Sequence, residues 1–231
     1  AMSGVGSSSA FTVGLLHSLY AVKGKFVTKR KLALEAIDIE QNRIGESVGS
    51  QDQIAAAFGG LNVIEFKKDD RIIVTPVTIP QKRIQELEDS LVLFFTGISR
   101  TASEIAKKQI LETKNKIKEL ARMKDMVDRA VQILCNNDKS LDEFGELLNS
   151  SWEIKRSITE KISNEFIDSI YLRGLKAGAV GGKLLGAGGG GFIAFYIRPE
   201  NKNSLISELS DLLHVPFHFD QMGSHIIHYS S

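Results

Sequence analysis

Two glycine-rich segments and two carboxylates are the residues of this chain best suited to chemistry. The first segment, residues 3–10 (SGVGSSSA), directly precedes a helical pattern. Small residues at a helix start expose backbone N–H groups, and the helix dipole adds positive potential there, so this loop could bind a phosphate. Its serine hydroxyls could also ligate a cation. A plain serine cap with a flexible lead-in fits the same residues, and the loop alone leaves both interpretations open.

The second segment, residues 183–192 (KLLGAGGGGF), contains a G-x-G-x-x-G spacing from Gly186 to Gly191. A dinucleotide fingerprint lies between a strand and a helix, but here a strand pattern follows the glycines. A P-loop is excluded as well, because Lys183 is not followed by serine or threonine. The segment therefore predicts a tight backbone turn beside a buried strand, where only glycine permits close approach.

Glu40 and Asp52 lie on either side of a polar stretch, residues 45–51 (GESVGSQ). Glu40 is near the end of a helical pattern, and Asp52 is in a stretch that is unsuited to a regular helix. If the two carboxylates converged, one could hold Mg²⁺ while the other accepted a proton from a substrate hydroxyl. Spacing does not show convergence, and most acidic residues at such spacings are surface residues.

The elements that must position these residues are of mixed type. Helical patterns cover residues 10–21, 29–43, 53–57, 101–134, 142–149, 154–177 and 202–213. Strand patterns cover residues 62–66, 71–77, 91–96, 192–197, 215–219 and 225–229. Because the helices gather in the middle of the chain and do not alternate regularly with strands, we expect an α+β fold rather than a parallel sheet.

Composition narrows the class of protein. The chain has 231 residues, 42% hydrophobic and 25% charged, which is ordinary for one or two globular domains. Its net charge of +1 gives no overall field that would attract nucleic acid or an anionic membrane. No stretch approaches the roughly 20 apolar residues of a spanning helix, a signal-peptide layout is absent, and Cys135 has no partner for an internal disulfide. We therefore expect a cytoplasmic protein.

Three segments, in this order, resemble signatures of the GHMP kinase superfamily, which includes galactokinase, homoserine kinase and mevalonate kinase. Residues 4–10 (GVGSSSA) resemble the second signature and residues 183–192 the third. The stretch around Asp52 is similar to the loop that carries the catalytic aspartate of galactokinases and mevalonate kinases. The resemblance implies the GHMP kinase fold, with residues 1–80 in an N-terminal domain, residues 81–231 in a C-terminal domain and the active site between them.

Four phrases are similar to the D-glycero-D-manno-heptose 7-phosphate kinases of this superfamily: residues 49–53 (GSQDQ), 57–62 (AFGGLN), 95–100 (FTGISR) and 151–156 (SWEIKR). The implied reaction moves the γ-phosphoryl group of ATP to the anomeric hydroxyl of the sugar phosphate, for GDP-heptose and surface polysaccharide synthesis. Fucokinases share parts of these phrases. A galactokinase- or fucokinase-like enzyme and a non-catalytic sugar- or ATP-binding relative therefore stay open.

The resemblance also implies that the chain is truncated at its N-terminus. The second signature normally begins with a proline, three variable residues and a glycine, and here only residues 1–3 precede Gly4. The preceding section of the family contains the first signature, which contributes substrate and nucleotide contacts and part of the sheet. Whether the chain is active without it, and whether it forms a homodimer, the sequence leaves open.

The resemblance assigns roles to individual residues. The phosphates of ATP would lie over a loop made of Gly4, Val5, Gly6, Ser7, Ser8 and Ser9. Ser8 and Glu40 would hold Mg²⁺, with a simple helix cap as the other interpretation of Ser8. Asp52 would accept the proton of the acceptor hydroxyl, or only position the sugar. Substrate-side residues would be Gly49, Gln51, Asp52, Arg100, Gly188 and Gly189. Arg100 is a candidate for the 7-phosphate because arginine binds phosphate bidentately, although a surface ion pair fits it too.

Overall fold

The computed structural model describes residues 4–98, 102–113 and 115–230, which form two compact units. The first unit consists of residues 5–77 and the segment from Phe219 onward, and the second consists of residues 78–218 together with Gly4. All residues after 80 were expected in the C-terminal domain, whereas the segment from Phe219 onward packs on the first unit. There the Ser224 amide donates to the carbonyl oxygen of Ala56 over 2.9 Å.

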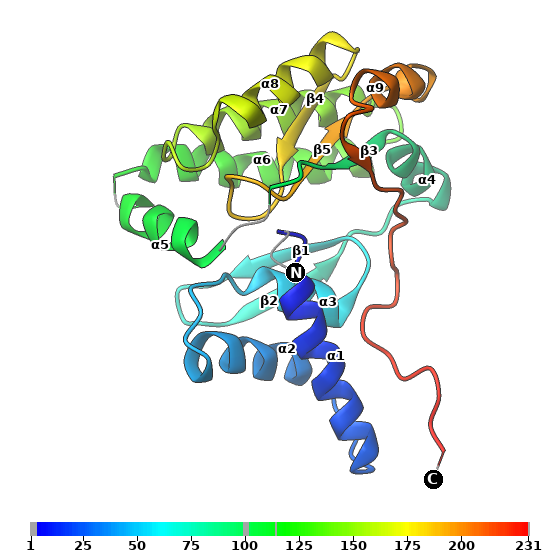
Figure 1. Cartoon of the computed structure of the whole chain (residues 1–231). Coiled ribbons are helices and arrows are strands. Elements are labelled where there is room, and N and C mark those ends of the chain that lie inside the picture. The colour runs from blue at the N-terminus through cyan, green and yellow to red at the C-terminus, as the bar shows by residue number, and fades with distance from the viewer. Residues whose placement is uncertain (1–3, 99–101, 114, 231) are drawn as a thin grey trace. The chain divides into compact units, whose positions relative to one another are not determined.

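Within its described residues, the first unit contains α1 (Ser7–Val22), α2 (Lys29–Asp38), a π-helix (Ile39–Arg43), α3 (Gln51–Phe58) and an antiparallel hairpin of β1 (Asn62–Phe66) and β2 (Ile72–Pro76) (Figure 1). Thr28 begins α2, because its side-chain oxygen accepts a hydrogen bond from the Lys31 amide. Apolar residues spaced three or four apart turn one side of each helix inward. Their common core consists of Val13, Leu32, Ala33, Ala36, Ile54 and Ala57.

Two local features of the first unit differ from the expected pattern. The helix that was expected to end at Arg43 closes its last turn as a π-helix, with a hydrogen bond from the Ile44 amide to the Ile39 carbonyl over 2.8 Å. Asp52 does not lie in an irregular stretch but in the first turn of α3. The alanines that follow favour helix, and an acidic side chain is stabilised beside the positive end of the helix dipole.

The second unit contains α4 (Gln81–Asp89), β3 (Leu91–Phe95), α5 (Ala102–Thr113), α6 (Ile117–Cys135), α7 (Asp142–Arg156), α8 (Glu165–Lys176), β4 (Gly181–Leu184), β5 (Phe192–Tyr196), a 3-10 turn (Pro199–Asn201), α9 (Lys202–Glu208) and β6 (Leu213–His214). Its sheet is antiparallel, in the order β4-β5-β3-β6. Helices α7 and α8 cover one face of this sheet (Figure 1). Helices packed on antiparallel strands confirm the expected α+β class.

Several helices of the second unit differ in extent from their patterns. The expected helix over residues 101–134 is divided into α5 and α6. The helix expected from Ile154 onward is divided as well, because α7 continues to Arg156 and α8 starts only after Asn164. The Asn164 side-chain oxygen accepts a hydrogen bond from the Ile167 amide over 3.0 Å, so it caps the second helix. Helix α9 ends at Glu208, five residues earlier than expected.

The strands expected at the C-terminus were wrong. In place of residues 215–219 the structure has only the two-residue strand β6, and residues 225–229 form no strand. An alternating pattern supplies no hydrogen-bonding neighbour, and these short segments find none along most of their length. Strand β4 was not predicted, although it pairs with β5. Its glycines are poor strand formers, yet a Cβ on Gly182 would lie 2.6 Å from the Phe195 ring.

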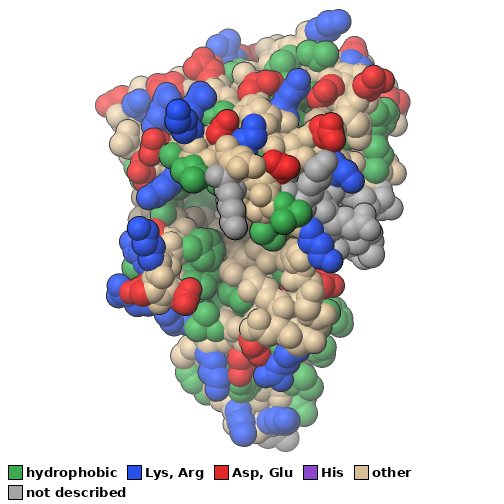
Figure 2. Space-filling view, turned by 90° about the vertical axis from the view of Figure 1, so that its left-hand side faces the viewer, with side chains coloured by type: hydrophobic (Ala, Val, Ile, Leu, Met, Phe, Trp, Pro, Cys, Tyr) green, Lys and Arg blue, Asp and Glu red, His purple; other side chains and the backbone are tan. Residues whose placement is uncertain are grey.

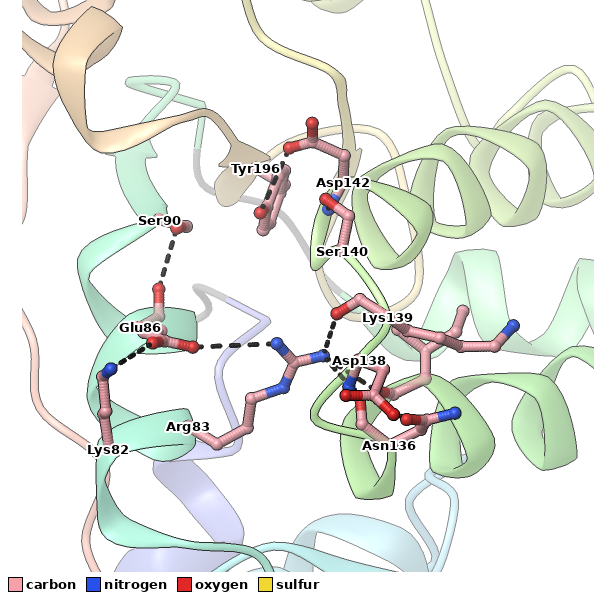
Figure 3. A network of polar contacts seen from close by, with 11 residues as sticks. Lys82, Arg83, Glu86, Ser90, Asn136, Asp138, Lys139, Ser140, Asp142 and Tyr196 are labelled. Atoms are coloured by element: carbon pink, nitrogen blue, oxygen red, sulfur yellow. Dashed lines mark hydrogen bonds and ion pairs between the residues drawn. The ribbon is translucent and has the colours of Figure 1, made fainter.

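A buried arginine joins α4, which the sequence analysis also missed, to the end of α6 (Figure 3). The Nη2 atom of Arg83 donates to the carbonyl oxygens of Ile133 at 3.0 Å, Asn136 at 3.2 Å and Lys139 at 2.7 Å. The last carbonyls of a helix have no partner within the helix. Arg83 therefore caps α6 and holds the turn that leads into α7.

The surface shows no dominant charge on the face drawn in Figure 2, where basic and acidic side chains are interspersed. Among the described residues, no helix is both long enough and apolar enough to span a bilayer.

Candidate active site

The N-terminus of α1 in the first unit has the general geometry from which helices bind anions. Gly6 precedes the helix in a left-handed conformation (φ 69°), and its carbonyl oxygen accepts a hydrogen bond from the Ala10 amide over 2.8 Å. The first turn contains no acidic residue. Its first backbone N–H groups and the positive end of the dipole are therefore not offset by a carboxylate of the helix itself.

The three serines of this first turn point in different directions. Ser9 is buried, and its hydroxyl donates to Glu40 Oε2 over 2.9 Å. Ser8 is exposed. Consecutive side chains of a helix point about 100° apart, so the two hydroxyls do not share this contact. Ser8 was expected to hold Mg²⁺ together with Glu40; the hydroxyl that contacts Glu40 in the structure is that of Ser9.

Glu40 is a charged side chain in the interior of the first unit, with 1% of its surface exposed. It lies on the π-helix that extends α2, and such wide turns recur at functional sites. Thr12 donates to its Oε1 over 2.9 Å, and Gln53 Nε2 and Ser9 donate to its Oε2. These donors from α1 and α3 compensate for the loss of water around the charge.

Asp52 lies against the same end of α1. A Cβ added to Gly6 would come within 3.2 Å of Asp52 Cβ and 3.3 Å of its Cγ. Burial raises the pKa of the Asp52 carboxyl, a hydrogen bond from Gln51 opposes this shift, and the charge of Glu40 adds to it. The two carboxylates therefore converge on the N-terminus of α1, which spacing in the sequence could not show. A carboxylate with a raised pKa is a better proton acceptor.

The loop before Asp52 is held in place by a side chain that the sequence analysis did not single out. Gln41 Nε2 donates to the carbonyl oxygen of Val48 over 2.9 Å and to the Ser50 hydroxyl over 3.0 Å. Gly49 is exposed on this loop, and a Cβ there would meet nothing within 4 Å. Gln51 is exposed as well, at the start of α3.

Thr12 and Gln53 were also missed as site residues. Thr12 is three positions after Ser9 on α1, which places both side chains on the same side of the helix. Gln53 directly follows Asp52 and is fully buried. A helical repeat of hydroxyl residues after the glycine loop was the available signal, but serine and threonine are common in helices without any such role.

The second glycine segment forms the turn between β4 and β5 in the second unit, which confirms the expected tight turn beside a buried strand. Gly188 has a φ of 110°, and a Cβ on it would lie 2.6 Å from Ile162 Cα. The Gly189 amide donates to the Ile162 carbonyl over 2.6 Å, and the Gly191 amide donates to the Ile98 carbonyl over 2.9 Å. Any side chain at Gly188 would therefore displace backbone.

Gly4 and Lys183 adjoin this turn. A Cβ on Gly4 would lie 3.2 Å from the Leu185 carbonyl oxygen, and Gly186 approaches Gly4 so closely that its own added Cβ would lie 2.7 Å from Gly4 Cα. Lys183 lies on β4, where burial lowers the pKa of its ammonium group. Arg100, expected to bind the sugar's phosphate, lies outside the described residues.

The donor set around Glu40 fits Mg²⁺. In the described part of the chain, no three His, Cys, Asp or Glu side chains gather as a metal cage. Mg²⁺ is commonly bound through one or two carboxylates together with phosphates of the substrate and retained waters. A single buried carboxylate beside hydroxyls, at a helix N-terminus that can receive phosphate, matches that mode.

Two family models match the chain. Residues 1–60 match the GHMP kinases N terminal domain, and residues 130–214 match the GHMP kinases C terminal domain. The chain belongs to the GHMP kinases, and the family resemblance stated from the three signature segments is confirmed.

Relatives with names and structures agree with this family. The D-glycero-alpha-D-manno-heptose 7-phosphate kinase of Campylobacter jejuni is 35% identical over 216 residues, which are 90% of this chain and 61% of the relative. A galactokinase of Pyrococcus furiosus is 27% identical, over 81% of this chain and 59% of the relative. The chain thus spans about three fifths of the length of these relatives.

Solved structures confirm the GHMP kinase fold. The crystal structure of a D-glycero-D-manno-heptose 1-phosphate kinase from Bacteroides thetaiotaomicron superimposes with a TM-score of 0.72 at 31% identity. That match covers 100% of this chain and 65% of the other. The mevalonate kinase of L. major has a TM-score of 0.71 at 21% identity, which shows the shared fold alone.

Proposed function

We propose that this protein is an ATP-dependent kinase that phosphorylates the anomeric hydroxyl of D-glycero-D-manno-heptose 7-phosphate. The observation that carries the proposal is the convergence of Asp52 and Glu40 on the N-terminus of α1. One buried carboxylate is held by hydroxyls, and the other has a raised pKa. The 35% identical heptose-phosphate kinase supports the choice of sugar.

Each residue at the N-terminus of α1 has a proposed task. The triphosphate of ATP lies over residues 4–9, where backbone amides and the helix dipole stabilise its charge. Glu40 and the exposed hydroxyl of Ser8 hold Mg²⁺, while Ser9 fixes Glu40. When bound, Mg²⁺ would neutralise charge on the phosphate oxygens.

Asp52 handles the proton of the acceptor. The anomeric hydroxyl donates its proton to the Asp52 carboxylate as its oxygen forms a bond to the γ-phosphorus. The bond from that phosphorus to the bridging oxygen breaks, and ADP leaves. An anomeric hydroxyl is more acidic than an ordinary alcohol, so a carboxylate with a moderately raised pKa is a sufficient base. The products are ADP and the heptose 1,7-bisphosphate.

The remaining proposed contacts are on the sugar side. Gly49 and Gln51 lie on the loop that leads to Asp52, Gly188 and Gly189 shape the turn without side chains, and Arg100 takes the 7-phosphate. We further propose that the enzyme works in the cytoplasm and that its product supplies the synthesis of a nucleotide-activated heptose for surface polysaccharide.

The test is ADP release by the purified protein with Mg·ATP. The acceptors are heptose 7-phosphate, galactose, fucose and mevalonate, each also given to Asp52→Asn and to the control Asp38→Asn. Asp38 is a surface carboxylate of α2 that pairs with Arg43. Turnover of the heptose phosphate that only Asp52→Asn abolishes is the expected result. Turnover of galactose or fucose would replace the acceptor, and ATP binding without any turnover would indicate a non-catalytic relative.

A further inference from the structure

The Glu40 carboxylate is restrained through both of its oxygens. Oε2 accepts hydrogen bonds from the Ser9 hydroxyl and from Gln53 Nε2, and Oε1 accepts one from Thr12. Each carboxylate oxygen offers about two lone pairs. The two donors at Oε2 use its capacity fully, so the hydrogen bonds of the cluster leave one lone pair, on Oε1.

Thr12 can serve Glu40 even though its hydroxyl has a second acceptor nearby. It is 3.1 Å from the Ser8 carbonyl oxygen and 2.9 Å from Glu40 Oε1. A hydroxyl has one hydrogen, and a charged acceptor at the shorter distance forms the stronger bond. The Thr12 hydroxyl therefore donates to Glu40 Oε1. This hydrogen bond fixes the position of Oε1, the oxygen that retains a lone pair.

Gln53 shows that the cluster is incomplete as a purely structural network. Its side chain is fully buried, and its Oε1 has no hydrogen-bond partner among the described residues. Turning the amide over would place that oxygen against the carboxylate, so Nε2 must face Glu40. A buried acceptor without a partner costs about 1–3 kcal/mol. A water bound to a cation donates its hydrogens and would satisfy this oxygen.

We propose that Thr12 and Gln53 are positioning residues for Mg²⁺. They orient the Glu40 carboxylate so that one lone pair of Oε1 ligates the cation, and Gln53 Oε1 accepts from a water on that cation. The inference rests on the proposed function in one respect, namely that the cation arrives with ATP. A cluster that only ties α1, α2 and α3 together would need no unpartnered acceptor.

The experiment measures cation affinity directly, with Mn²⁺ as the probe, because it takes the same oxygen ligands and has an electron paramagnetic resonance signal. Free Mn²⁺ is titrated into the purified protein with a non-hydrolysable ATP analogue. The test variants are Thr12→Val, which keeps the shape but removes the hydroxyl, and Gln53→Met. Thr12→Ser restores the hydroxyl. Ser18→Ala is the matched control, because the Ser18 hydroxyl lies on the same helix and donates to the Gly14 carbonyl oxygen instead of Glu40.

We expect Thr12→Val and Gln53→Met to weaken Mn²⁺ binding about tenfold or more, as is usual when a partner of a metal ligand is removed. Thr12→Ser and Ser18→Ala should bind as the wild type does, and metal-free nucleotide binding should be unchanged in all. Wild-type Mn²⁺ affinity in both test variants, with or without a loss of thermal stability, would overturn the inference. So would a wild-type protein that binds no Mn²⁺ with the nucleotide.

Two further measurements keep the outcome unambiguous. Gln53→Asn keeps both amide atoms but is one methylene shorter, so it tests the contact with little disturbance of the core if Gln53→Met does not fold. The acceptor panel separates this inference from the proposed function. No turnover of any sugar, combined with weakened Mn²⁺ binding in the variants, would reject the sugar-kinase proposal and retain the positioning roles. Turnover of a sugar phosphate, combined with unchanged Mn²⁺ binding in the variants, would retain the sugar-kinase proposal and reject the positioning roles.

Discussion

Gly6 and Asp52 are in direct contact in the first unit, although 45 residues separate them in the chain. A Cβ on Gly6 would lie 3.2 Å from Asp52 Cβ and 3.5 Å from its Oδ2. Gly6 also has a φ of 69°, a backbone angle that residues other than glycine rarely adopt. The glycine therefore provides the left-handed turn before α1 and leaves room for the Asp52 carboxylate.

Gly6→Ala should lower phosphoryl transfer strongly and cost about 1–2 kcal/mol of unfolding free energy, because it adds both backbone strain and contact with Asp52. Gly14→Ala is the control on the same helix. A Cβ at Gly14 meets nothing within 4 Å, so this change should stabilise by about 0.5–1 kcal/mol. Urea denaturation and ADP release measure both quantities. Equal effects of the two substitutions would contradict the special role of Gly6.

Asp52→Asn should lower transfer by about 10²–10⁴-fold, the usual contribution of a general base. The same change should stabilise the fold at neutral pH by roughly 0.5–2 kcal/mol, since it relieves a buried charge beside Glu40. A variant that is both less active and less stable would argue against a strained catalytic carboxylate.

The stabilisation should depend on pH in a defined direction. The folded state raises the pKa of Asp52, so it binds the proton more tightly than the unfolded state does. Below the unfolded pKa of about 3.9 both states are protonated, and the wild type and Asp52→Asn should be equally stable. The difference in unfolding free energy should appear as the pH rises above this value and level off above the folded pKa. Denaturation curves of both proteins between about pH 3 and 8 measure it; a difference that does not change with pH would contradict the raised pKa of Asp52.

Arg83→Met should destabilise the second unit by about 2–4 kcal/mol, because three carbonyl oxygens in and just after the last turn of α6 each lose a hydrogen-bond donor (Figure 3). Lys82→Met is the neighbouring control. Lys82 is exposed and lies 3.9 Å from Glu86, so its loss should change stability by less than about 0.5 kcal/mol. If urea midpoints of the two variants coincide, the cap contributes nothing.

Gly188→Ala should cost about 2 kcal/mol or more, since a Cβ there meets the backbone of Ile162 at 2.6 Å. Gly97→Ala is the control that separates the cost of a left-handed backbone from the cost of a steric clash. Gly97 has a φ of 77°, and its added Cβ would meet nothing within 4 Å. It should therefore cost only the left-handed backbone term of about 1–2 kcal/mol. A smaller loss at Gly188 than at Gly97 in thermal denaturation would rule out the close approach.

The local structure of the two glycine-rich segments could be predicted from the sequence. Glycines before a helical pattern predicted the start of α1, and glycines before a strand pattern predicted a tight turn instead of a dinucleotide site. Both hold because the conformations open to glycine and the periodicity of apolar residues are local properties. The signature segments and their order were sufficient to predict the family. The mixture of helical and strand patterns was sufficient to predict the α+β class.

Which side chains contact one another depends on how the helices pack in three dimensions. The sequence suggested Ser8 as the partner of Glu40, whereas the packing of α1 against the π-helix brings the Ser9 hydroxyl to this carboxylate. Thr12 and Gln53 contact Glu40 because the helices that carry them pack around one core. Asp52 lies in a helix because the apolar residues of α3 are buried in the same core. Strand β4, with its two glycines, forms only where Phe195 leaves no room for a Cβ. Contacts between distant residues depend on packing, which no local pattern encodes.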